Sequence, residues 1–115
     1  MGSLRTKEMT DAYHAYQAAQ PADVCHLCDT PALQTFKFWK VIPDKFPYDR
    51  IAQKHDLLVP LRHVQEGELR TEERQEFYAL KTDYLNSHYE ILIETAPHLK
   101  SVPAHHHVHL IVIKE

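Results

Sequence analysis

Glycine is scarce in this sequence, which has two glycines among its 115 residues. Phosphate loops of the P-loop or dinucleotide-binding kind need several glycines, because backbone amides must approach the phosphate closely. The sequence also lacks the ~20 consecutive apolar residues of a membrane helix, and residues 1–8 lack the apolar core of a signal peptide. We therefore expect neither glycine-rich nucleotide-binding loops nor membrane contact, and we predict a cytoplasmic protein.

An excess of positive charge is missing as well. Lysine and arginine total 13 against 16 acidic residues, for a net charge of -3. A broad basic surface for nucleic acid is therefore not expected. Hydrophobic residues make up 43% of the chain and charged residues 25%, which is ordinary for a folded protein. The length suits one domain, so we predict a single domain over residues 1–115.

The order of hydrophobic patterns predicts an α+β fold. A helix is expected near the N-terminus, within residues 1–20, and a long helix from a cap at Thr71 to about Thr95. Period-two patterns predict strands over residues 34–42, 56–59 and 105–113. Strands and helices that do not alternate regularly favour an antiparallel sheet, against which the long helix packs.

Histidine is the residue in greatest excess, with ten in the chain. In a strand, alternate side chains share a face. One face of this strand would then carry a row of three imidazoles, from His105, His107 and His109. The other face would bury the apolar residues Val108, Leu110 and Val112. Imidazole suits nucleophilic or acid-base chemistry near neutral pH, and it also binds metals. A solvated, histidine-rich strand is the alternative interpretation.

The pattern His-x-His-x-His followed by apolar residues resembles the signature of the histidine triad family of nucleotide hydrolases and transferases. A second segment, residues 54–64, is similar to the strand and turn of that family, with a histidine, apolar strand residues, a proline, a basic residue and a further histidine. The two motifs occur in the order found in the family. The resemblance implies an antiparallel sheet with a long helix on it, and sheets that join across a homodimer.

The resemblance also implies a chemistry. The middle histidine of the triad, here His107, would attack the α-phosphate of a nucleotide and form a transient nucleotidyl-histidine. His109 matches the third position, which contacts phosphate, and His105 matches the first, which supports the site or binds metal. His55 matches the histidine beside the active site of the family. The implied substrates are nucleoside phosphoramidates and dinucleoside polyphosphates.

Three further residues are candidates for contact with substrate. Asp44 follows the first strand, where the family often has an aspartate that binds ribose hydroxyls; a turn residue is an equal alternative. The loop before the triad lacks the glycine of many family members. Lys100 and Ser101 in this loop could supply a charge and a hydroxyl for phosphate, although a plain polar loop is also consistent with the sequence.

The only cysteines are Cys25 and Cys28. In a reducing compartment, the spacing C-x-x-C favours a metal site or a redox pair over a structural disulfide. The pair matches an N-terminal C-x-x-C in a subset of the histidine triad family. The resemblance then implies a structural zinc ion bound by Cys25, Cys28, His63 and His105. His26, between the cysteines, is expected to point away.

Two other functions remain open at this point. One is a nucleotide-binding regulatory relative without turnover. The other is a metal-binding protein in which the histidine-rich segment holds a transition metal through His105, His106, His107 and His109.

Overall fold

The computed structural model describes residues 3–96, 102 and 104–115. Five strands form an antiparallel sheet in the order β1-β2-β3-β5-β4. The strands are β1 (Gln34–Thr35), β2 (Trp39–Pro43), β3 (Ala52–Pro60), β4 (Ile91–Ile93) and β5 (Val108–Ile113). The predicted α+β class with an antiparallel sheet is therefore confirmed. Residues Lys100 and Ser101, two of the candidate phosphate ligands, lie outside the described residues.

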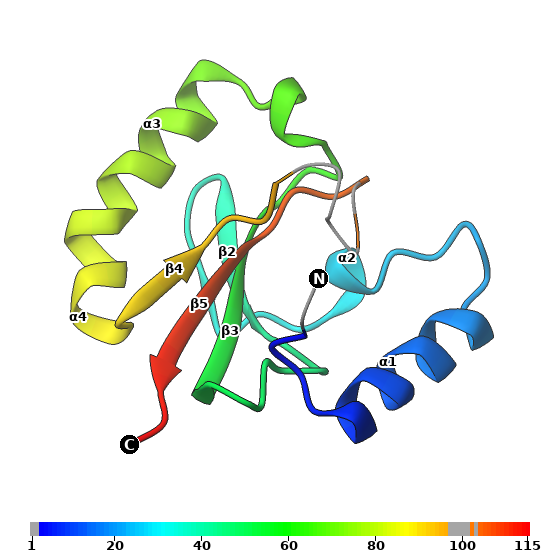
Figure 1. Cartoon of the computed structure of the whole chain (residues 1–115). Coiled ribbons are helices and arrows are strands. Elements are labelled where there is room, and N and C mark those ends of the chain that lie inside the picture. The colour runs from blue at the N-terminus through cyan, green and yellow to red at the C-terminus, as the bar shows by residue number, and fades with distance from the viewer. Residues whose placement is uncertain (1–2, 97–101, 103) are drawn as a thin grey trace.

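Helices cover both faces of the sheet (Figure 1). A helical run of 18 residues comprises α3 (Thr71–Leu80), a π-helical turn η2 (Lys81–Leu85) and α4 (Asn86–His88). The helix α1 (Lys7–Ala19) and the short helix α2 (His26–Asp29) lie on the other side. A 3₁₀ turn, η1 (Glu66–Glu68), precedes α3. None of the described helices has the length and apolar composition needed to cross a membrane.

The alternation of side chains along the strands divides the core in two. Under the long helix, Val41, Leu58, Val108 and Leu110 pack with Trp39, Leu80, Leu85 and Tyr89. On the opposite face, Leu27 of α2 packs on Ile42, Leu57 and Val59. His55 and His109 are buried, and in the period-two alternation of β3 and β5 they belong to the second face. The second face therefore holds both apolar packing and imidazoles.

The long helix ends earlier than its periodicity predicts. It stops at His88, and residues Ile91–Ile93 form β4, which pairs with β5 through Ile91↔Ile111. Ile91 is consequently a strand residue with an exposed side chain, and His88, at the end of the helix, is exposed as well. The start also differs in detail, since Arg70 is the cap and its N–H donates to Glu73 at 2.7 Å.

The first predicted strand is in fact a hairpin. Gln34 pairs with Val41 and Thr35 with Lys40, and the Phe36 N–H donates to the Trp39 carbonyl at 2.7 Å. The chain therefore reverses where the alternation of Phe36 and Phe38 predicted one straight strand. Both phenylalanines still pack against the core, which explains why their spacing was misleading.

Replacing Leu58 by alanine should lower the free energy of unfolding by about 2–5 kcal/mol, because the side chain is fully buried and would leave a cavity. Leu33→Ala is the matched control: that leucine is 58% exposed, and its loss should cost less than about 0.5 kcal/mol. Urea unfolding followed by the fluorescence of Trp39, the only tryptophan, measures both. Equal effects of the two changes would contradict the assignment of the core.

Candidate metal centre and triad site

Four side chains from three distant segments of the chain converge beside α2. They are the two cysteines of the C-x-x-C segment, the histidine after β3 and the first triad histidine: Cys25, Cys28, His63 and His105. Their ligand atoms all lie within 4.8 Å of one another. This is the set that the resemblance implied, and it could hold a metal ion. His26 points away from it, toward Tyr16, with ring centroids 5.6 Å apart.

The spacing of the four atoms fits one tetrahedral ion. Two ring nitrogens in a tetrahedral zinc site lie about 3.3 Å apart, and a nitrogen and a sulfur about 3.5 Å apart, given the usual bond lengths. The two Nδ1 atoms of His63 and His105 are 3.2 Å apart. The Sγ of Cys28 lies 3.3 Å from His63 Nδ1 and 3.4 Å from His105 Nδ1, and the Sγ of Cys25 lies 3.5 Å from His105 Nδ1.

A second contact fixes the ring of His105. Its Nε2–H donates to the carbonyl of Pro60 at 3.0 Å, which assigns the lone pair to Nδ1, the atom that faces the cysteines. Metal-bound histidines commonly have their second nitrogen bound in this way. Partial burial and, to a smaller extent, the adjacent Cys25 raise the pKa of the Cys28 thiol to about 11. A cation among these four atoms would favour the thiolates that bind it.

The three triad histidines do not share one strand face. Only His109 lies within β5, and residues 105–107 precede the strand, because the His106 N–H donates to the carbonyl of Val64 at 2.7 Å. The predicted burial of Val108 and Leu110 is confirmed, while Val112 is half-buried. The predicted row of three imidazoles on one face of a strand is therefore wrong, and the alternative of a solvated strand is also wrong, since His105, His107 and His109 are each at most 4% exposed.

His107 has a defined tautomer. Its Nδ1–H donates to the carbonyl of His105 at 2.9 Å, so that Nε2 carries the lone pair. Its ring meets the ring of His109 edge-on, with centroids 5.3 Å apart. A neutral imidazole with one nitrogen held by a backbone carbonyl is the arrangement that nucleophilic attack by the other nitrogen requires.

A chain of hydrogen bonds fixes the rings next to His107. The backbone N–H of Tyr48 donates to His55 Nδ1 at 2.9 Å, so the proton of this ring is on Nε2. His55 Nε2–H faces His109 Nδ1 at 2.9 Å and the Asp44 carboxylate at 3.3 Å. His109 Nε2–H then points to the Tyr48 hydroxyl at 3.1 Å. Both nitrogens of His109 therefore have protein partners already.

Asp44, His55 and His109 also lie close enough to be considered as metal ligands. The two ring nitrogens are 2.9 Å apart, however, which is a hydrogen-bond distance and shorter than the about 3.3 Å between two nitrogens on one tetrahedral ion. A third group, Glu66, Glu94 and His106, includes two exposed carboxylates. Among the described residues, His105, His106, His107 and His109 do not converge as one set of four ligands.

Burial keeps the two inner histidines neutral. Burial, with a smaller contribution from neighbouring positive charges that include Arg5, lowers the pKa of His55 to about 4 and that of His109 to about 2. Burial has the opposite effect on an acid, and it raises the pKa of Asp44 to about 6. At pH 7 the site thus contains neutral imidazoles beside an ionised Asp44.

These shifts make stability depend on pH. A histidine with a lowered pKa binds fewer protons in the folded state, so stability falls as the pH drops from about 6.5 towards the folded value. Between pH 7 and pH 5 we expect His109 to lower the free energy of unfolding by about 2 kcal/mol. Asp44 has a raised pKa, so its effect on the free energy of unfolding has the opposite sign. Urea unfolding at both pH values should show a smaller loss in His109→Gln. Because both proteins keep the four cysteine and histidine ligands, the pH dependence of metal binding cancels, and equal losses would contradict a neutral His109.

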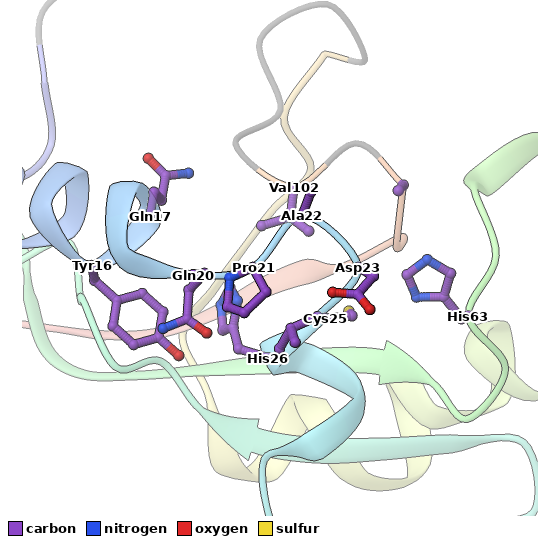
Figure 2. Close-up of a pocket in the computed structure, with 12 residues that line it drawn as sticks. Tyr16, Gln17, Gln20, Pro21, Ala22, Asp23, Cys25, His26, His63 and Val102 are labelled. Carbon is purple, nitrogen blue, oxygen red and sulfur yellow. The ribbon is translucent and has the colours of Figure 1, made fainter.

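The described residues line several cavities of very different size, among them one of about 230 Å³ that shares His26, Leu27, Asp44 and Leu57 with the cavity at the triad. A cavity of about 20 Å³ is lined by His107, His109, Asp44 and Arg5, which leaves room for about one water molecule. A cavity of about 460 Å³ lies between α1 and the C-x-x-C segment (Figure 2). His26 and Val102 line both, so they separate the triad from the larger space.

Two residues of the site had no signal in the sequence analysis. Tyr48 stacks on His109, with ring centroids 4.7 Å apart, and Arg5 lines the small cavity from the N-terminal segment. Neither belongs to a recognisable spacing, and only the folded chain brings them to the triad.

Comparisons with known proteins identify no relative. No protein-family model matches the chain, and neither a curated protein nor a solved structure matches it significantly. The resemblance to the histidine triad family therefore rests on the two motifs, and the function has to be argued from the site.

Proposed function

We propose that the protein is a nucleotide hydrolase or transferase of the histidine triad kind, with His107 as the nucleophile. The observation that carries this proposal is the hydrogen bond from His107 Nδ1 to the carbonyl of His105, at 2.9 Å. It makes Nδ1 of a buried imidazole the donor, so that in the neutral ring Nε2 has the lone pair needed for attack on phosphorus.

The proposed reaction has two steps. In the first, His107 Nε2 forms a bond to the α-phosphorus while the bond to the leaving amine or phosphate breaks, and the leaving group departs with the electron pair and takes up a proton from solvent. In the second, a water oxygen bonds to phosphorus and releases a proton to solvent, while the N–P bond breaks and its electron pair returns to Nε2. Another acceptor in place of water makes the reaction a transfer.

The neighbouring residues position the nucleophile in this proposal. His109 packs edge-on against His107 and is held by His55 and Tyr48, so contact between His109 and phosphate would require one of these hydrogen bonds to break. Asp44 lines the same cavity and is the proposed acceptor for ribose hydroxyls. Its Oδ1 also accepts from the Phe46 N–H at 2.9 Å, which is the turn role expected as the alternative.

We also propose that the metal site binds zinc and is structural. Two thiolates and two imidazoles suit tetrahedral zinc, and a site with four protein ligands leaves no open position for substrate. Its effect on the reaction would be indirect: His105 links the site to His107 through its carbonyl. The homodimer stays a prediction, for which β4 offers an edge strand of the sheet.

A nucleotide-binding protein without turnover is the second candidate. The cavity at His107, at about 20 Å³, favours it if the lining stays in place, because the α-phosphate of a bound nucleotide then cannot reach His107 Nε2. The discriminating experiment uses adenosine and guanosine phosphoramidates together with dinucleoside polyphosphates, with the products identified. Release of a nucleoside monophosphate supports the hydrolase; binding without products in every case supports the second candidate.

A further inference from the structure

The N-terminal segment is attached to the body of the domain immediately around Arg5. The carbonyl of Leu4 accepts from the Arg50 N–H at 3.1 Å. Thr6 donates to the Asp49 carboxylate twice, through its N–H and its hydroxyl, at 2.7 Å each, and Thr6 also caps α1 by accepting from the Met9 N–H. The backbone of Arg5 is thus fixed on both sides.

The side chain of Arg5 is held just as closely. Its guanidinium carbon lies 4.6 Å from the centre of the Tyr13 ring and 4.8 Å from that of Tyr48. Its Nε–H donates to the carbonyl of Phe46 at 2.7 Å. Two rings and one hydrogen bond define the position of this planar group.

The outer nitrogens of Arg5 have no such partner. In the parts of the chain that the structure describes, neither Nη group has a hydrogen-bond acceptor, and no carboxylate forms an ion pair with Arg5. The guanidinium of arginine is suited to bind a carboxylate or a phosphate with these nitrogens, often through two parallel bonds.

Arg5 lines the same small cavity as His107 and His109. Among the described residues that line this cavity, Arg5 is the only lysine or arginine, and burial keeps the neighbouring His109 neutral. The negative Asp44 lines it too, and it accepts hydrogen bonds from the Phe46 N–H and faces His55 rather than pairing with Arg5.

We propose that the Nη groups of Arg5 form an anion site for a phosphoryl group, and that Arg5 is a positioning residue that holds this group against His107. The role in turnover rests on the function proposed above, whereas phosphate binding does not depend on it. The site would supply, from the N-terminal segment, a phosphate contact of the kind that the glycine-containing loop before the triad supplies in many members of the histidine triad family. Because the cavity holds about one water molecule, part of its lining must move when phosphate enters.

Phosphate binding by four proteins tests the proposal. Titration calorimetry with inorganic phosphate and with a nucleoside monophosphate compares wild type, Arg5→Gln, Arg5→Lys and the control Arg50→Gln. Arg50 is exposed and contributes a backbone contact to the same segment, which glutamine keeps. We expect Arg5→Gln to weaken binding of both ligands by roughly 10- to 100-fold, Arg5→Lys to be intermediate, and Arg50→Gln to stay within about twofold.

A second readout separates binding from packing. The Nε–Hε resonance of Arg5 in wild type should shift during a phosphate titration, because the ligand binds the same guanidinium. If Arg5→Gln binds phosphate as wild type does, the proposal is overturned. It is also overturned if both Arg5 variants lose binding and thermal stability in parallel while the Nε–Hε resonance does not move, since Arg5 would then act only by packing between the tyrosines.

The same proteins distinguish this site from the proposed reaction. Phosphate binding that depends on Arg5 in a protein with no turnover of any nucleotide would retain the anion site and reject the hydrolase. Turnover that depends on His107 with unchanged phosphate affinity and unchanged kcat/KM in Arg5→Gln would retain the hydrolase and reject the anion site.

Discussion

Replacing His107 by asparagine should abolish turnover of nucleotide substrates while leaving nucleotide binding largely intact. Asparagine keeps a polar side chain of similar shape, and it lacks the nitrogen lone pair that attacks phosphorus. A loss of more than about 10³-fold in kcat is expected when the only nucleophile is removed. Replacing His109 should cost less, about 10²-fold, because it acts by positioning His107.

Trapping the intermediate is the decisive measurement. Brief incubation with substrate labelled at the α-phosphate, followed by a quench that preserves N–P bonds, should leave label on wild type and none on His107→Asn. The matched control is His88→Asn, an exposed histidine on α4 that should label as wild type does. An undiminished adduct in His107→Asn would show that another residue is the nucleophile, and full turnover in it would remove the triad from the mechanism.

Removal of the metal should have the largest effect on stability. The four ligands connect the C-x-x-C segment, the end of β3 and the segment before β5, and no disulfide joins these parts. Structural zinc sites contribute on the order of 10 kcal/mol of apparent binding free energy at neutral pH. Cys25→Ser with Cys28→Ser should therefore abolish zinc binding and lower Tm strongly.

Metal content, thermal unfolding and phosphate affinity measured together test this prediction. The double variant should show a strong fall in Tm and a smaller change in phosphate affinity, because Arg5, the proposed phosphate ligand, is not one of the four metal ligands. His26→Ser is the control, because this residue lies inside the same motif and points toward Tyr16 rather than into the metal site. Wild-type protein purified without zinc, and equal Tm values for wild type and the double variant, would reject a structural metal.

Local patterns were enough to predict the elements whose side chains alternate between two environments. Val108 and Leu110 are buried against the long helix as the period of two requires. The fold class follows from the order of such segments. The ligand set of the metal centre came from motif resemblance, and the described atoms of Cys25, Cys28, His63 and His105 lie together as that set implies.

Local patterns failed where a short apolar run fits two periods. Ile91, Leu92 and Ile93 continue the spacing of the long helix, yet they form β4 because β5 offers them a hydrogen-bonding partner. The same limitation hid the turn after Thr35, since Phe36 and Phe38 both lie in this turn and both pack against the core. A pairing partner distant in sequence decides such cases.

The sequence alone determined the reactive groups of this protein, namely three closely spaced imidazoles and a pair of thiols. It also determined the antiparallel sheet that carries them. Only the tertiary structure decided which nitrogen of each imidazole carries the proton, because this depends on the carbonyls of Pro60 and His105 and on Tyr48. It also decided that Arg5 lies beside the triad, since long-range contacts through Asp49 and Arg50 place it there. Burial and hydrogen bonding act between residues far apart in the chain, and no local spacing encodes them.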